Sequence, residues 1–234
     1  MKSITWILAL TMMLSCHLAG AAAHQHIRVQ TSYYEISREA FAKMLKGNQT
    51  EQPYQKVRKL VQSGQAALFH VSLLTCRPGE STRAASILEV IYPTEYSPPE
   101  LCHLGSIGGR TSLGNDPLFS KPIDKTPTAF ETRNVGASLE IMATLMKDGQ
   151  HIKLMLEQEL VSHPRNRLYL DFKDQFGNIR MSFPGFDSKQ VDVTVTLTNK
   201  IPKLITAYTP HNKEGTPEPD RKIIVFAKAT IVSP

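Results

Sequence analysis

Apolar and polar residues alternate along much of the chain, and the alternation is clearest between residues 128 and 161. Every second position is apolar in two runs, Leu139, Ile141, Ala143 and Leu145, then Ile152, Leu154 and Leu156. A period of two indicates β-strands, and the Asp148-Gly149 pair between the runs is a strong hairpin signal. We therefore expect a β-hairpin that buries Ile141 and Leu154.

Other segments divide into two helices and a series of strands. A helical period predicts helices over 38–46, capped by Ser37, and from Pro53 to Gly64. Alternating or β-rich runs predict strands at 27–36, 66–75, 82–92, 168–172, 191–198 and 222–232. The sequence thus predicts a β-dominated α+β fold, with two short N-terminal helices and antiparallel or mixed sheets built of hairpins. Residues 93–128 are rich in Pro, Gly and Ser and predict a long surface loop.

The first 23 residues have the pattern of a secretory signal peptide. Lys2 is followed by an apolar stretch over 4–14 and by small residues ending at Ala23. We expect cleavage after Ala23, which leaves residues 24–234 as a single α+β domain. No later stretch holds about 18 consecutive apolar residues, so no transmembrane helix is expected. The predicted location is the periplasm, the outer-membrane surface or the medium.

The formal net charge of +6 is distributed over the sequence without long basic runs. Because the basic residues are scattered singly among acids rather than clustered, we expect the charge to serve ordinary solubility, with weak attraction to anionic surfaces. Nucleic acid is not an expected partner.

Two cysteines, Cys76 and Cys102, follow the expected cleavage point. In an oxidising compartment an even pair is compatible with a disulfide, which would close a loop of about 26 residues and contribute about 3 kcal/mol. Two buried free thiols are the alternative, and the sequence leaves both open.

The expected mature N-terminus offers one candidate metal site. It would read His24-Gln25-His26, and a terminal amine with nearby histidines can bind Cu(II), as in the copper brace of polysaccharide monooxygenases. A shifted cleavage point or a frayed terminus would leave both histidines inert. The other histidines lack the paired spacing of a zinc site, and no Gly-x-Ser-x-Gly nucleophile motif occurs. No catalytic residue and no cofactor is therefore assigned.

The order of several segments resembles the core domain of bacterial secretins, the proteins of type II and type III secretion and of type IV pili. The stretch "TAFETRNVGASLEIMATLMKDGQHIKLMLEQELV" resembles the secretin core motif, in which a Val-Gly pair precedes an alternating strand, an acidic-Gly turn and a second strand. Before it, "VRKLVQSGQAALFHVSLLTCRPGESTRAASILEVIYPT" resembles the family's helix, strand, turn and strand ending in Tyr-Pro. After it, "FPGFDSKQVDVTVTLTNKIPKLI" and "RKIIVFAKATIV" resemble its final strand pair. The resemblance covers about residues 29–232.

Three departures from the secretin pattern limit what the resemblance implies. Residues 204–208 lack the Gly pair of the family, and the segment from Arg165 to Phe183 is expected to be too short for a long gate hairpin. The match also begins almost at the cleavage site, so the upstream ring-building domains are not expected. The chain resembles a divergent, stand-alone secretin core without its gate.

The resemblance implies a non-enzymatic structural, assembly or interaction protein of a secretion or type IV pilus system. Its partners would be proteins of the cell envelope or further copies of itself. The alternative is a secreted copper-binding oxidase that uses His24. N-terminal sequencing of the mature protein, combined with copper titration, separates the two hypotheses.

Overall fold

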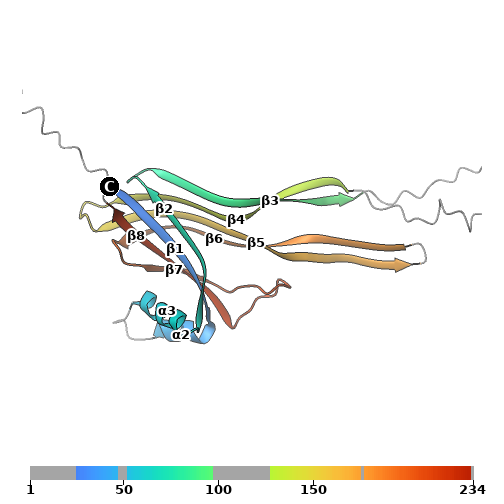
Figure 1. Cartoon of the computed structure of the whole chain (residues 1–234), viewed down its shortest axis with the longest axis horizontal. Coiled ribbons are helices and arrows are strands. Elements are labelled where there is room, and N and C mark those ends of the chain that lie inside the picture. The colour runs from blue at the N-terminus through green and yellow to red at the C-terminus, as the bar shows by residue number, and fades with distance from the viewer. Residues whose placement is uncertain (1–24, 47–51, 97–126, 175–176, 233–234) are drawn as a thin grey trace, which may run out of the picture.

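The computed structural model describes residues 25–46, 52–96, 127–174 and 177–232 of the 234-residue chain. These residues form two four-stranded antiparallel sheets and two helices, which confirms the β-dominated α+β class. The small sheet has the strand order β2-β1-β8-β7, and the long sheet has the order β3-β4-β5-β6 (Figure 1). The expected signal peptide, residues 1–23, lies outside the described residues and stays a prediction, as does the single-domain assignment.

The small sheet joins the two ends of the described chain. It consists of β1 (His26–Ser37), β2 (Ala66–Cys76), β7 (Lys203–Tyr208) and β8 (Arg221–Val232). Strand β1 pairs along its whole length with β8, so that Ile27 lies opposite Ile231. Strand β2 pairs with the other side of β1, and β7 pairs with the other side of β8. The strands predicted at 27–36, 66–75 and 222–232 are confirmed.

Two helices, α2 (Arg38–Lys46) and α3 (Pro53–Gln62), cover part of the outer face of the small sheet (Figure 1). The Ser37 hydroxyl accepts a hydrogen bond from the Ala40 amide at 3.1 Å, which is the cap that the sequence predicts. Gly64, with φ of 73°, ends the second helix in the left-handed conformation that glycine tolerates. Both predicted helices are confirmed.

These helices also gather basic charge. The two helices hold a single acid, Glu39, beside the following basic residues: Arg38, Lys43 and Lys46 on α2, and Lys56, Arg58 and Lys59 on α3. The expectation that basic residues are scattered among acids is therefore wrong for this part of the surface. The sequence hides the cluster because the linker between the helices separates its two halves.

The long sheet contains the predicted hairpin. It consists of β3 (Ser81–Tyr96), β4 (Pro127–Leu145), β5 (His151–Asp174) and β6 (Gly177–Thr198). Ile141 and Leu154 are both fully buried, as predicted. In the turn, the Asp148 carboxylate accepts hydrogen bonds from the amides of His151 and Gln150, and these bonds lower the pKa of Asp148 to about 2.

The main hydrophobic core lies between the two sheets. Its buried residues come from the facing sides of both sheets: Ile27, Val29, Cys76, Ala227 and Ala229 from the small sheet, and Leu139, Ile141, Ala143, Ile152, Leu154, Leu156, Val191 and Leu197 from the long sheet. A second cluster around Met44, Val57 and Phe226 fastens the helices to the opposite face of the small sheet. The molecule therefore has three layers, in the order helices, small sheet and long sheet.

The long sheet is longer than the sequence predicts. Strand β3 continues to Tyr96 and β4 begins at Pro127, so both ends of the predicted 93–128 loop are strand; residues 97–126 lie outside the described part. The strands predicted at 168–172 and 191–198 belong to one continuous hairpin of β5 and β6.

Residues 165–183 are therefore the outer end of one long hairpin of β5 and β6, which extends well beyond the single strand that the sequence predicts at 168–172. Pro164 and Pro184 concealed it, because proline normally interrupts a strand. Here β4–β5 pairing ends at Val161, so Pro164 lies where β5 pairs only with β6, at an irregularity in the register. Pro184 lies on β6, an outer strand of the sheet. Prolines are tolerated at such positions.

Candidate assembly interface

The two outer strands of the long sheet, β3 and β6, are its unpaired edges in the described chain. Each presents a row of backbone N–H and C=O groups that can pair with another strand. Strand β3 also exposes large apolar side chains: Ile87 is 52% exposed, Leu88 is 68% exposed and Ile91 is 65% exposed. A long edge with exposed apolar side chains is the geometry expected of a surface that pairs with a further strand.

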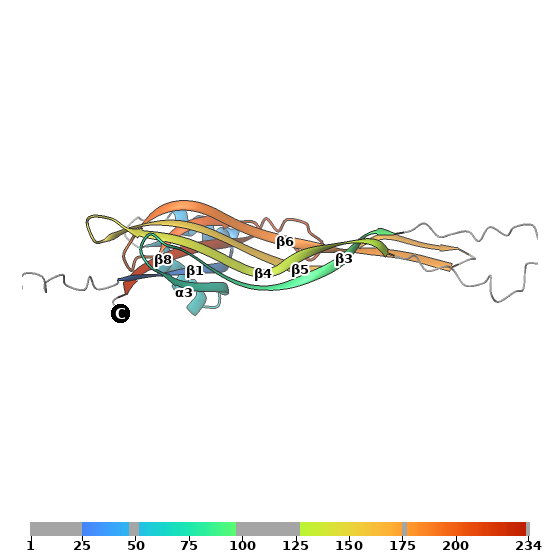
Figure 2. The same cartoon turned by 90° about the horizontal axis from the view of Figure 1, so that it is seen from above.

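The edges extend beyond the small sheet because the long sheet divides into two arms. Pairing between β4 and β5 ends at Gly136 opposite Val161, whereas β3–β4 and β5–β6 pairing continues outward. Figure 1 shows the two arms side by side beyond this fork, and Figure 2 shows how far they reach past the small sheet. Gly136 has φ of 136°, and a Cβ at this residue would lie 2.2 Å from the Ser86 carbonyl oxygen. Only glycine fits the fork.

Aromatic side chains connect the two arms. The rings of Tyr92 on β3 and Phe186 on β6 have centroids 5.6 Å apart, and those of Tyr96 and Phe183 are 6.2 Å apart. The tilted and edge-to-face arrangements are the favourable ones for aromatic pairs. These contacts fix the position of one arm relative to the other. The β3 and β6 edges therefore belong to one rigid surface.

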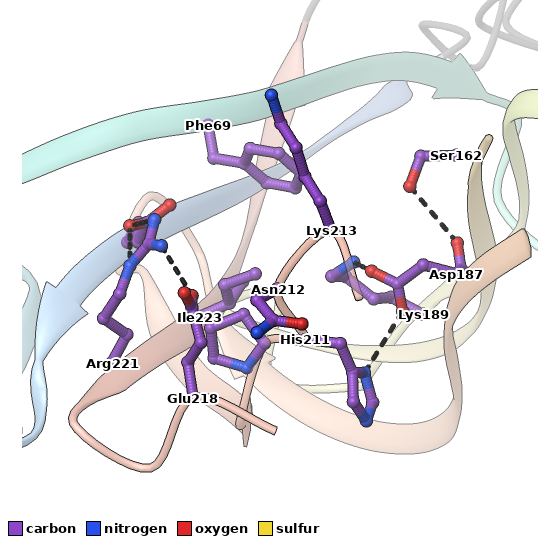
Figure 3. Close-up of a pocket in the computed structure, with 12 residues that line it drawn as sticks. Phe69, Ser162, Asp187, Lys189, His211, Asn212, Lys213, Glu218, Arg221 and Ile223 are labelled. Atoms are coloured by element: carbon purple, nitrogen blue, oxygen red, sulfur yellow. Dashed lines mark hydrogen bonds and ion pairs between the residues drawn. The ribbon is translucent and has the colours of Figure 1, made fainter. Parts of the chain in front are cut away.

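The structure also contains a pocket between the small sheet, β6 and the chain over 210–218 (Figure 3). Its volume is about 180 Å³. On one side, Arg221 pairs with Glu35 and Glu218. On the other side, Asp187 pairs with Lys189 at 2.6 Å and with His211 at 3.4 Å. The Lys189 ammonium is largely buried and also lies 5.8 Å from the centre of the Phe69 ring.

The chemistry of this pocket favours a structural role. Lys189, His211 and Arg221 pair with the carboxylates of Asp187, Glu35 and Glu218. The Ser162 hydroxyl donates to the Asp187 backbone carbonyl at 3.4 Å. Among the described residues that line the pocket, the Ser162 hydroxyl is hydrogen-bonded to a backbone carbonyl and not to the side chain of a general base. The ion pairs instead connect β1, β6 and the chain around residue 211. We infer that they fix the small sheet against the long one.

Of the two predicted cysteines, Cys76 is described and Cys102 lies outside the described residues. The Cys76 thiol is buried in the main core and donates to the Ile27 carbonyl at 3.7 Å; burial raises its pKa. Cys76 lies near Ser81, the first residue of β3, because only a short turn separates the two. In that turn the Gly79 amide donates a hydrogen bond to the Ala143 carbonyl at 2.8 Å, next to the β4 residue that pairs with Ser81. From there β3 runs 16 residues to Tyr96, about 50 Å at roughly 3.3 Å per residue.

The length of β3 bears on whether Cys76 and Cys102 can form a disulfide. Cys102 follows Tyr96 by six residues, a span of at most about 22 Å. We therefore expect Cys76 and Cys102 to be free thiols within one chain. Alkylation of unfolded, unreduced protein, read by mass spectrometry, should modify both cysteines. Protection of both until a reductant is added would instead establish the bridge.

Of the two candidate copper ligands, His24 and His26, the structure describes only the second. His24 lies outside the described residues, and His26 begins β1 opposite Val232. Within the described ranges, His, Cys, Asp and Glu do not form a group of three that could hold a metal ion. The same part of the chain contains no helix long and apolar enough to cross a membrane.

Sequence reasoning missed both the β3 edge and the pocket. The edge had a detectable signal, since Ile87-Leu88 and Val90-Ile91 place apolar residues on both faces of one strand. The pocket had none, because Glu35, Asp187 and Arg221 come together only through the pairing of distant strands.

Neither the protein-family models nor the curated proteins give a match to the sequence. Among solved structures, the chain is similar to Aeromonas hydrophila ExeD, with a TM-score of 0.47 and 11% identity over 97% of this chain and 52% of that one. It is similar to the type II secretion system secretin GspD of E. coli K12, with a TM-score of 0.40 and 10% identity over 99% of this chain and 54% of that one. It is also similar to the type II secretion system secretin XcpQ of Pseudomonas aeruginosa, with a TM-score of 0.41 and 11% identity over 98% of this chain and 64% of that one.

The chain spans about half the length of the first two structures.

Proposed function

We propose that this chain is an exported, non-enzymatic assembly protein of the cell envelope, related to the secretin component of a secretion or type IV pilus system. It associates with further copies of itself through the edges of the long sheet. One observation carries the proposal: β3 and β6 are long strands with an unpaired side, and β3 exposes Ile87, Leu88 and Ile91. Such an edge in water favours association.

The directions of the strands allow the sheet to continue from one copy to the next. Neighbours in the order β3-β4-β5-β6 are antiparallel, so β3 and β6 run in opposite directions. Strand β3 of a second copy can therefore lie antiparallel to β6 of the first, and the sheet repeats. This contact is head-to-tail, since it joins two different edges. Repeated head-to-tail contacts give a closed ring or an open filament, according to the rotation between copies.

Two further features support this function over the alternative. The stretch that resembles the secretin core motif, from the Val135-Gly136 pair through the hairpin of β4 and β5, forms the centre of the long sheet. Within the described part of the chain, His, Cys, Asp and Glu form no group of three that could hold a metal ion, so nothing there adds to the copper-oxidase alternative. The export step and the envelope partners rest on the sequence pattern of residues 1–23 and on the resemblance.

The edge hypothesis predicts that charge on β3 blocks self-association. We expect the unaltered protein to elute as an oligomer in size-exclusion chromatography with light scattering, measured with and without detergent. The double variant Ile87→Lys, Leu88→Lys should elute as a monomer, because it places an ammonium on each face of the edge strand. Its thermal stability should change by less than about 1 kcal/mol, since both side chains are more than half exposed.

A matched control uses the edge of the small sheet. Leu68 and Leu73 on β2 are 51% and 58% exposed, so Leu68→Lys, Leu73→Lys changes apolarity and charge to a similar extent. This variant should remain oligomeric. Dissociation caused by the β2 variant, with the β3 variant still oligomeric, would transfer the interface to the small sheet and refute the proposal.

A further inference from the structure

A second surface of the molecule is distinguished by charge. We call it the basic helix face and define it by Lys43 and Lys46 on α2 and Lys56, Arg58 and Lys59 on α3. Glu39 is the single acid in these two helices. Arg38 also lies on α2 and pairs with Asp220 at 3.2 Å. The face therefore carries a net positive charge on adjoining helices.

The fold presents these charges on a fixed platform. Met44 and Val57 are buried beneath the helices, and the rings of Tyr54 and Phe226 meet edge to face at 5.4 Å. The Lys56 ammonium donates to the Met44 carbonyl at 3.3 Å, which links α3 to α2. Because packing fixes both helices against the small sheet, the charges are held on one rigid platform. Repulsion between them favours an anionic partner.

We propose that the basic helix face binds the anionic headgroups of a phospholipid surface. Clusters of four to eight basic residues on a helical surface are typical of anionic-lipid binding, where each Lys or Arg increases affinity about fivefold. Leu45, which is 57% exposed, lies between Lys43 and Lys46 in the sequence and supplies an apolar side chain for the interfacial region.

The composition of the face favours lipid over an acidic protein. Protein interfaces are enriched in aromatic residues and depleted of lysine. The aromatic residues of the two helices, Phe41 and Tyr54, are instead packed against the small sheet, which leaves lysine, arginine and glutamine outermost. A bilayer surface requires no complementary pockets, and long flexible cationic side chains suit it.

The position of the face makes this binding independent of the proposed assembly. The helices lie on the side of the small sheet that faces away from the long sheet (Figure 1). A membrane surface bound there leaves the β3 and β6 edges open. The inference therefore does not rest on the proposed function, and the two can fail separately.

Co-sedimentation with vesicles tests the proposal. The purified chain should bind vesicles of phosphatidylcholine with phosphatidylglycerol and should not bind phosphatidylcholine alone. The triple variant Lys43→Glu, Lys46→Glu, Arg58→Glu should lose affinity by a hundredfold or more, on the order of fivefold for each charge removed, with reversal adding to the loss. Raising the salt concentration should release the unaltered protein, because exposed charges are screened.

A charge-matched control separates the face from net charge. Lys147→Glu, Lys153→Glu, Lys213→Glu changes the net charge equally at exposed positions away from the helices. This control should bind the anionic vesicles like the unaltered protein. Equal loss in both triple variants, binding to neutral vesicles, or capture of polyglutamate without capture of anionic vesicles would overturn the proposal; the last result would assign the face to an acidic polypeptide.

Discussion

Replacing Ile141 by Asp should abolish cooperative folding. Ile141 is 1% exposed and lies in the core between the two sheets, where an aspartate would be buried without a cation or a hydrogen-bond donor. An unpaired buried carboxylate costs several kcal/mol, against a total stability of about 5–15 kcal/mol for an ordinary domain. Leu154→Asp should have the same effect, since Leu154 is 0% exposed and lies on the same buried face. Thermal unfolding followed by circular dichroism measures both.

Lys153 provides the control from the opposite face of the same strand. Its side chain is exposed between the buried Ile152 and Leu154. Lys153→Asp introduces the same carboxylate into water, and we expect stability to change by about 0.5 kcal/mol or less. If Ile141, Leu154 and Lys153 tolerated aspartate equally, the two-sheet core would be wrong.

Replacing Gly136 by Ala should destabilise the fold more than any other glycine-to-alanine change described here. The φ of 136° is accessible almost only to glycine, and the new Cβ would lie 2.2 Å from the Ser86 carbonyl oxygen and 3.0 Å from the Ile87 Cα. Both are backbone atoms, so β3 itself must move. We expect a loss of about 3 kcal/mol or more, measured as a lower urea midpoint with an unchanged slope.

Gly149→Ala is the control that separates the steric clash at Gly136 from the cost of a positive φ. Gly149 also has a positive φ, 69°, but a Cβ there meets nothing within 4 Å. Gly149→Ala should therefore cost only about 1 kcal/mol, the usual penalty of the left-handed conformation. Equal losses for the two variants would show that backbone conformation alone, without crowding at the fork, explains the requirement for glycine.

The sequence predicted the elements whose signals are local. The helix over 38–46 has a capping Ser37 and an apolar face, and the hairpin around Asp148-Gly149 has strict alternation on both sides. These signals act within a few residues, and the structure agrees with them. The burial of Ile141 and Leu154 followed from the same alternation, because one face of a half-buried strand must enter the core.

What the sequence could not predict depends on partners far along the chain. Pro164 and Pro184 are compatible with long strands only because β5 lacks a β4 partner beyond Val161 and β6 is an outer strand. The basic helix face and the ion pairs around Asp187 likewise come from segments that only folding brings together. The candidate interface on β3 depends on which strand lies at the edge, and strand order is a property of the whole sheet.

The pairing of β1 with β8 has a consequence for the time course of folding. Contacts between residues far apart in sequence form slowly, because a long loop must close before any of them is made. Ile27 cannot meet Ile231 until all the residues between them have been synthesised. The helices pack partly on Ile224 and Phe226 of β8, so they too await the last strand. The early segments of a nascent chain therefore stay without their core until β8 has been made, and over that time they are exposed to proteases and to aggregation.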